Sequence, residues 1–256
     1  MSDVLYIVMP AYNEEANIET VIREWYPVIE THAGGRSRLV VVNDGSKDST
    51  YAAAKALEQK MPQLEVLDKP NSGHGATVLY AYRYALDAGA DYIFQTDSDG
   101  QTRPAEFEPF WERRQANAAT IGWRRGREDG ASRVFVTKTL KLVLRLTFGI
   151  NVTDANTPYR LMRREVLEAY IPDVPKDFNL SNVMLTVLFL YNEEKVEFLP
   201  ITFRPRQGGV NSINLPRIVG IGRQALHDFR DIKRHMKKHN HPVVPKVGYI
   251  EIGGNK

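Results

Sequence analysis

The chain has 256 residues, with 34 Lys or Arg, 31 Asp or Glu and a formal net charge of +3. It contains no cysteine, which excludes disulfides, thiolate metal sites and a cysteine nucleophile. No apolar run reaches the roughly 18 residues that a transmembrane helix needs, and the N-terminus lacks the basic flank and cleavage site of a signal peptide. We therefore expect a cytoplasmic protein.

The first half of the chain alternates short apolar runs with amphipathic segments. The strands we predict are Leu5–Met9, Leu39–Asn43, Leu64–Leu67, Tyr92–Thr96 and Thr120–Trp123. The helices we predict between them lie near 15–31, 49–60, 75–88 and 104–116. Strands spaced in this way indicate βαβ units and a parallel sheet. Their nearly continuous apolar runs are typical of strands that are covered on both faces.

The second half has a different pattern. We predict helices near 134–150, 163–170 and 180–191, a strand over Lys195–Phe203, a basic polar loop over Arg204–Asn214 and a long helix near 215–238. No linker or repeat separates these segments. We expect a single structural domain, in which residues 1–212 form the main unit and 213–256 an amphipathic helix and tail packed on it.

Charge is distributed unevenly between the two halves. Residues 1–122 have a balance of −7, and residues 123–256 have a balance of +10. This asymmetry indicates that the second half faces an anionic partner such as a phosphate, a nucleic acid or a lipid surface.

Ligands of a doubly wound sheet bind beyond the carboxyl ends of its strands, so the loops at those ends are the candidates for a site. The first loop, Pro10–Glu14, matches neither a dinucleotide-binding glycine motif nor a P-loop. Taken alone, this loop is more typical of a helix start, with Asn13 as the cap and Glu14 beside the positive end of the helix dipole.

The next two loops carry a carboxylate and glycines. Asp44 stands at the tip of the second strand, where it can accept hydrogen bonds from a base or ribose, or form a simple turn before Gly45. Glycines in Asn71–Ala76 allow close backbone approach, and the helix start there favours phosphate. We expect His74 to be structural.

The fourth loop, Gln95–Gln101, is the strongest candidate. Asp97 and Asp99 are two carboxylates two residues apart, just past a strand. Such a pair repels itself unless it shares a cation, and oxygen ligands suit Mg²⁺ or Mn²⁺, which commonly complete their shell with substrate phosphates. The alternative is a solvated polar turn.

The order of these loops resembles the family 2 glycosyltransferases. The resemblance covers about 200 residues, and its segments read MPAYNEE, VVNDGSKDST, KPNSGHGATVLYAYRYALDAGADYIFQTDSDGQ, IGWRRG, DANTPYRLMRREVLE and VEFLPITFRPRQGG. Within that family the chain is most similar to the polyprenyl-phosphate sugar transferases. The resemblance implies an α/β fold with a nucleotide-sugar-binding, Rossmann-like, mostly parallel sheet (the glycosyltransferase A fold) and C-terminal amphipathic helices.

The resemblance also implies roles for individual residues. Those that would hold the base and ribose of the donor are Pro10, Tyr12, Glu14, Val42 and Asp44. Asp97 would contact ribose or sugar, with Ser98 beside it, while Asp99 and Gln101 would hold Mg²⁺ or Mn²⁺ on the diphosphate. Arg124 and Arg206 would neutralise phosphates of donor or acceptor.

The chain departs from the family pattern in four places. Asn43-Asp44 replaces the Asp-Asp of many members, and the Gln-x-x-Arg-Trp signature of processive synthases is absent, which favours a single transfer. Asn156–Arg160 stands where lipid-using relatives usually have Thr-Ser-Gly-Phe-Arg, which implies that Arg160 binds substrate.

The fourth departure concerns the general base. Many members carry a Glu-Asp pair after residue 170, whereas 178–183 here holds no carboxylate. A phosphate acceptor needs no base, because its second pKa of about 6 leaves it mostly anionic at neutral pH. Asp154 or Asp177 remains a candidate base for a hydroxyl acceptor.

The basic helices suggest a membrane surface. Lys138, Lys141 and Arg145 form a stripe in Thr137–Phe148, and the predicted helix near 215–238 combines an apolar stripe with many basic residues. Such helices can lie on an anionic leaflet, or they can pack on the core with a solvated basic face.

The resemblance, together with these features, implies a metal-dependent inverting glycosyltransferase that moves one sugar from a UDP- or GDP-sugar to a polyprenyl phosphate, peripheral on the inner face of the plasma membrane. The alternative keeps the donor and uses a glycan or other hydroxyl acceptor in cell-surface polysaccharide synthesis. A nucleotidyltransferase would need a glycine-rich basic loop that is missing, and nucleic-acid binding does not explain the acidic loops.

Overall fold

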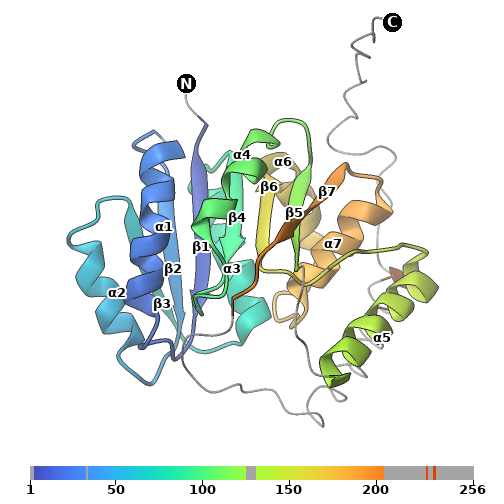
Figure 1. The fold of residues 1–256 in the computed structure, drawn as a ribbon, viewed down its shortest axis with the longest axis horizontal. Coiled ribbons are helices and arrows are strands. Elements are labelled where there is room, and N and C mark those ends of the chain that lie inside the picture. The colour runs from blue at the N-terminus through green and yellow to red at the C-terminus, as the bar shows by residue number, and fades with distance from the viewer. Residues whose placement is uncertain (1–2, 33, 125–130, 205–228, 230–232, 235–256) are drawn as a thin grey trace, which may run out of the picture.

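The computed structural model describes residues 3–32, 34–124, 131–204, 229 and 233–234. Seven strands in this part of the chain form one sheet in the order β3-β2-β1-β4-β6-β5-β7 (Figure 1). Neighbouring strands are parallel except at β6, which is antiparallel to both β4 and β5. The strands are β1 (Leu5–Ala11), β2 (Arg38–Asp44), β3 (Leu64–Lys69), β4 (Tyr92–Thr96), β5 (Ala119–Arg124), β6 (Tyr159–Arg163) and β7 (Val196–Ile201).

Helices connect the strands. They are α1 (Ile18–His32), α2 (Thr50–Glu58), α3 (His74–Asp87), α4 (Glu108–Glu112), α5 (Ala131–Phe148), α6 (Arg164–Tyr170) and α7 (Ser181–Tyr191), with short 3-10 turns at Pro104–Glu106 and Ile171–Asp173. The predicted helix near 104–116 is thus shorter and divided in two. The other predicted strands and helices up to residue 203 are confirmed within a few residues, and the helix near 215–238 lies almost wholly outside the described residues.

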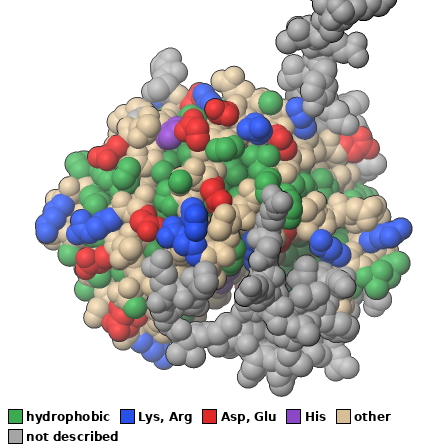
Figure 2. Space-filling view, viewed as in Figure 1, with side chains coloured by type: hydrophobic (Ala, Val, Ile, Leu, Met, Phe, Trp, Pro, Cys, Tyr) green, Lys and Arg blue, Asp and Glu red, His purple; other side chains and the backbone are tan. Residues whose placement is uncertain are grey.

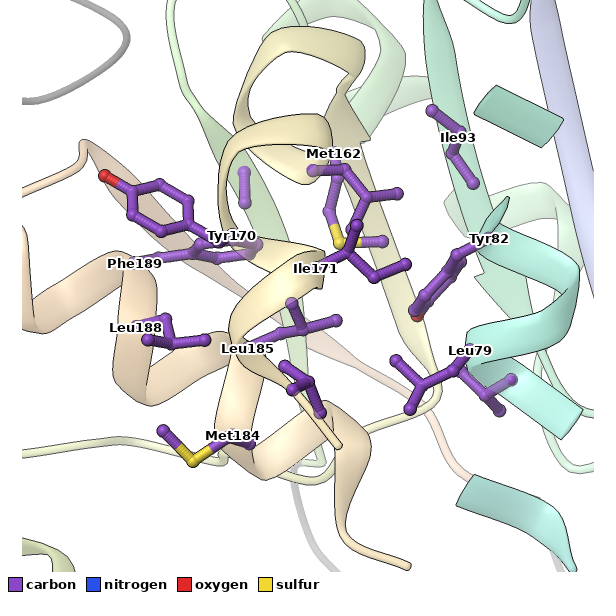
Figure 3. Packing of buried hydrophobic residues seen from close by; sticks show 14 of the residues in the cluster. Leu79, Tyr82, Ile93, Met162, Tyr170, Ile171, Met184, Leu185, Leu188 and Phe189 are labelled. Carbon is purple, nitrogen blue, oxygen red and sulfur yellow. The ribbon is translucent and has the colours of Figure 1, made fainter. Parts of the chain in front are cut away.

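Both faces of the sheet are buried. Tyr6 and Val8 of β1 pack in a core cluster with α3, α6 and α7, while Leu5 and Ile7 pack in a second cluster with α1, α2 and α4. Figure 3 shows part of the first cluster, with Leu79 and Tyr82 of α3 on one side and Leu185 of α7 on the other. This two-sided burial explains the continuous apolar runs in the sequence.

β6 is the element that the sequence pattern did not reveal. It reads YRLMR, and it inserts between β4 and β5 with Arg160 opposite Gln95 and Ile121. A buried arginine in a five-residue strand does not give the apolar run by which buried strands are recognised.

None of the helices within the described ranges combines the length and the hydropathy that a membrane span requires.

The first turn of α3 touches the segment before α7. A Cβ atom at Gly75 would lie 2.3 Å from the carbonyl oxygen of Phe178 and 2.5 Å from that of Asn179. Both neighbours are backbone atoms, so they cannot move aside as a flexible side chain would. Gly75 therefore allows two segments of backbone to pack together.

We expect Gly75→Ala to lower the free energy of unfolding by about 1–3 kcal/mol, the usual cost of overpacking. Urea denaturation measures the change, and Gly35→Ala is the control because nothing lies within 4 Å of a Cβ atom at Gly35. Equal stability of the two variants would contradict the close packing at Gly75.

Candidate active site

The candidate residues gather at the carboxyl ends of the strands. Asp44 ends β2, Asp97 follows β4 directly and Arg124 ends β5. Tyr12, just past β1, has 43% of its surface exposed, so it can contact a ligand. The predicted sites of these loops therefore share one edge of the sheet.

The first two loops are joined by hydrogen bonds. The backbone N–H of Asn13 donates to Ser46 Oγ at 3.0 Å, and Asn13 Oδ1 accepts from the backbone N–H of Lys47 at 2.9 Å. Asn13 is thus a bridge between loops rather than the cap of α1, which begins at Ile18. Glu14 is buried and accepts a hydrogen bond from Asn17 Nδ2 at 2.8 Å.

Asp44 is buried and bound by donors on the next loop. Its carboxylate accepts hydrogen bonds from the backbone N–H of Ser72 at 2.9 Å, from that of Gly73 at 3.0 Å and from Lys69 Nζ. Burial works to raise the pKa of Asp44, but these donors outweigh it and lower the pKa below its ordinary value. The carboxylate is therefore ionised and tightly held at the end of β2.

This arrangement changes the interpretation of the third loop, Asn71–Ala76. The N–H groups of Ser72 and Gly73, just before α3, are used by Asp44 rather than presented to a phosphate, and Gly75 accommodates neighbouring backbone. Lys69, which we did not single out from the sequence, holds the arrangement together. The signal that could have identified Lys69 is its position at the carboxyl end of β3.

The loop after β4 presents the two carboxylates. Asp97 and Asp99 are both partly exposed, and His74 Nε2 lies 3.9 Å from Asp97 Oδ1. Burial raises the pKa of Asp97 to about 6, with the His74 ring acting to lower it and Asp99 to raise it. Ser98 points the other way, and its hydroxyl donates to the carbonyl oxygen of Pro10 at 2.8 Å, which fixes this loop against β1.

Gln101 links this loop to the chain after β7. Its Nε2 donates to the carbonyl oxygen of Arg204 at 2.9 Å, and its own carbonyl accepts from the backbone N–H of Arg204 at 2.8 Å. Arg204 Nη2 in turn donates to Glu24 and to the carbonyl of Thr102, both at 3.1 Å. Arg206, predicted to bind phosphate, lies outside the described residues.

Arg124 and Asp154 form a bidentate ion pair. Nε and Nη2 of Arg124 donate to the two carboxylate oxygens at 2.9 and 3.0 Å, and each side chain is about one seventh exposed (13% and 15%). Burial acts to raise the pKa of Asp154, but Arg124 outweighs it and lowers the pKa. A carboxylate held in this way is a weak base, and the guanidinium keeps its charge near the acidic loop.

Two residues that were predicted to contact substrate have completely buried side chains. Arg160 is completely buried, and its five N–H groups are engaged by the protein's own carbonyl and hydroxyl oxygens. Val42 is also completely buried, in the core cluster on the α3 side of the sheet. Neither side chain has surface for a ligand, and both support the loops that do.

Comparison with known proteins agrees with this fold. The family described as Glycosyl transferase family 2 matches residues 6–171. Polyprenol monophosphomannose synthase from Mycolicibacterium smegmatis is 28% identical over 217 residues, covering 81% of this chain and 80% of that protein. Dolichyl-phosphate beta-glucosyltransferase ALG5C from Trichomonas vaginalis is 29% identical over 183 residues, covering 65% of this chain and 53% of that protein.

Among solved structures, the fold is similar to that of glucosyl-3-phosphoglycerate synthase from Mycobacterium tuberculosis in complex with Mn²⁺, UDP-glucose and glycerol 3-phosphate. The TM-score is 0.67 at 19% identity, with 91% of this chain and 80% of that chain covered.

The chain is thus an α/β enzyme with the glycosyltransferase A fold. It belongs to glycosyl transferase family 2, and its relatives include polyprenyl-phosphate sugar transferases.

Proposed function

We propose that the enzyme transfers one sugar from a UDP- or GDP-sugar to a polyprenyl phosphate. The observation that carries the proposal is the acidic loop after β4, with Asp97 and Asp99 partly exposed at the same sheet edge as Asp44 and Tyr12. These residues supply what a nucleotide-sugar donor requires: oxygen ligands for its counter-ion and polar groups for its nucleoside.

The donor set fits Mg²⁺ or Mn²⁺ bound together with a diphosphate. Asp99 and the amide oxygen of Gln101 are hard oxygen ligands, and no group of three acidic or His side chains in the described part of the chain could hold an ion alone. The remaining ligands would therefore come from donor phosphates. When bound, the ion stabilises negative charge on the leaving nucleoside diphosphate.

The state of the candidate base Asp154 supports an anionic acceptor. Asp154 is occupied by Arg124 and has a lowered pKa, and Asn182 at the start of α7 is an amide inside the protein. A phosphate monoester attacks without giving up a proton, because it is already ionised near neutral pH. A hydroxyl acceptor remains the alternative, with the exposed Asp177 as its base.

The surface of α5 supports docking on an anionic membrane. Leu144 and Phe148 face the core, whereas Leu142 is 56% and Leu146 77% exposed. Lys141 and the neighbouring Arg145 are exposed beside them. Figure 2 shows hydrophobic and basic side chains next to one another at this end of the molecule. An exposed apolar pair with basic neighbours is suited to insertion below anionic headgroups.

We expect the double variant Leu142→Ser/Leu146→Ser to bind anionic liposomes at least about tenfold more weakly, because each buried leucine contributes about 1.5–3 kcal/mol. Flotation at low and high salt measures binding, and salt should weaken it further. Tyr80→Ser is the control, since Tyr80 is 41% exposed on a different helix, α3. Equal flotation of the wild type, the double variant and Tyr80→Ser would show that α5 is not part of the docking surface.

The function as a whole is tested by a screen of UDP- and GDP-sugars with a short-chain polyprenyl phosphate, with Mn²⁺ or with EDTA. Transfer to the lipid phosphate with one nucleotide, lost in EDTA, is the expected result. Glycosylation of short hydroxyl acceptors but not of the lipid phosphate would replace the proposal with its alternative.

A further inference from the structure

A chain of hydrogen bonds runs from the core to Asp97. The Tyr82 hydroxyl lies 3.0 Å from Asn182 Oδ1, Asn182 Nδ2 donates to Gln95 Oε1 at 2.8 Å, and Gln95 Nε2 donates to Asp97 Oδ1 at 3.1 Å. Its members come from α3, α7 and β4, which are far apart in the sequence. Only Asp97, at the end of the chain of bonds, is partly exposed.

The orientation of the Gln95 amide is fixed by its two partners. A reversed amide would place its oxygen against the Asp97 carboxylate and its NH₂ against the NH₂ of Asn182, so both hydrogen bonds would be lost. Burial raises the pKa of Tyr82, so its hydroxyl stays protonated and can donate to Asn182 or to Gln95 Oε1, which lies 3.1 Å away. Tyr82 and Gln95 are completely buried, so water does not compete for these bonds.

The backbone of Asn182 is fixed as well. Its carbonyl oxygen accepts from Arg160 Nη1 at 3.0 Å and from Thr186 Oγ1 at 2.8 Å. The far end of the chain of bonds is thus rigid, and this rigidity extends through two oriented amides to the Asp97 carboxylate. A buried polar network of this kind imposes one geometry on its members.

We propose that Tyr82, Asn182 and Gln95 are positioning residues that hold the Asp97 carboxylate in the orientation that binds the nucleotide donor. This inference rests on the proposed function, because it assigns Asp97 a donor contact. It goes further by giving three interior residues, none of which reaches the surface, a measurable effect on that contact. A network with a purely structural role would affect stability and leave the contact unchanged.

The test is a binding cycle that requires no acceptor and no turnover. Calorimetry measures the affinity for UDP and for GDP in Mn²⁺. The proteins are the wild type, the single variants Gln95→Met, Tyr82→Phe and Asp97→Asn, and the double variants Gln95→Met/Asp97→Asn and Tyr82→Phe/Asp97→Asn. We expect Gln95→Met to weaken binding about 5- to 20-fold, as the loss of one hydrogen bond to a charged group would, and Tyr82→Phe to weaken it less. In the Asp97→Asn background neither should have a further effect.

Tyr170→Phe is the matched control. Tyr170 is also completely buried, its hydroxyl donates to Glu194 at 2.8 Å, and Figure 3 shows it across the cluster from Tyr82. Its variant should lower the melting temperature without changing nucleotide affinity. Tyr82→Phe removes one oxygen and keeps the ring, so it keeps the test valid if Gln95→Met does not fold.

The possible failures are distinguishable. Wild-type protein that binds neither nucleotide, or Asp97→Asn that binds as the wild type does, would overturn the proposed donor site and this inference with it. Weak binding by Asp97→Asn together with wild-type affinity in Gln95→Met and Tyr82→Phe would overturn the inference alone. Effects that add in the combined variants would also overturn it.

Discussion

Asp99→Asn is expected to lower transfer activity about 10²–10³-fold, the usual loss when one group that stabilises transition-state charge is removed. Asp99 lies in the loop after β4, where the backbone N–H of Gln101 donates to its Oδ1 at 3.1 Å. An amide keeps the shape of the side chain and removes the charge that a divalent ion requires. Initial rates at saturating donor, with Mn²⁺ titrated, measure the loss.

The fold should survive this substitution, because Asp99 is partly exposed at a strand end and lies outside the core clusters. Circular dichroism and thermal unfolding check this directly. Asp87→Asn at the exposed end of α3 is the control for removing one surface charge, and it should keep full activity. Full activity in Asp99→Asn, or in the wild type with EDTA, would show that the acidic loop holds no essential ion.

Arg160→Met is expected to lower the free energy of unfolding by about 3–5 kcal/mol, comparable to the loss of one partner in a buried charged network. Methionine fills part of the volume but donates no hydrogen bond. The carbonyl oxygens of Ala155, Thr157 and Asn182 would each lose a donor inside the protein. Denaturant unfolding with an unchanged m-value is the measurement.

Arg163→Met is the control on the same strand, since Arg163 pairs with the exposed Glu165 at 3.0 Å and should cost about 1 kcal/mol or less. Arg160→Lys restores the charge but not the five donors, so its stability should fall between that of the wild type and Arg160→Met. A loss in Arg160→Met no larger than that in Arg163→Met would contradict a structural role for Arg160.

Local sequence patterns were sufficient to predict most of the strands and helices. Runs such as Val40–Val42 are apolar because both faces of their strand are covered, and the helical segments carry the matching periodicity. β6 was missed because its stability comes from its two neighbours in the sheet. A strand that is held by distant partners and contains a charged residue has no sufficient signal of its own.

The candidate site shows the same division. The sequence places Asp44, Asp97 and Asp99 at strand ends, and the structure brings their loops to one edge. The sequence alone could not show that Asp44 is bound by Lys69, or that the Arg160 side chain is buried. The sequence motif is the same whether its arginine faces a ligand or a set of backbone carbonyls. Only the three-dimensional contacts distinguish a binding arginine from a structural one.

The place of β6 in the sheet has a consequence for biosynthesis. β5 emerges from the ribosome before β6, yet among the described strands it pairs only with β6 and β7. The half-sheet β3-β2-β1-β4 can assemble as soon as β4 is made, whereas β5 must wait for residues 159–163. During that interval the outer edge of β4 and both edges of β5 are open to pairing with other chains. We therefore expect a nascent chain stalled between β5 and β6 to be prone to aggregation, and fragments that end there to be poor choices for expression.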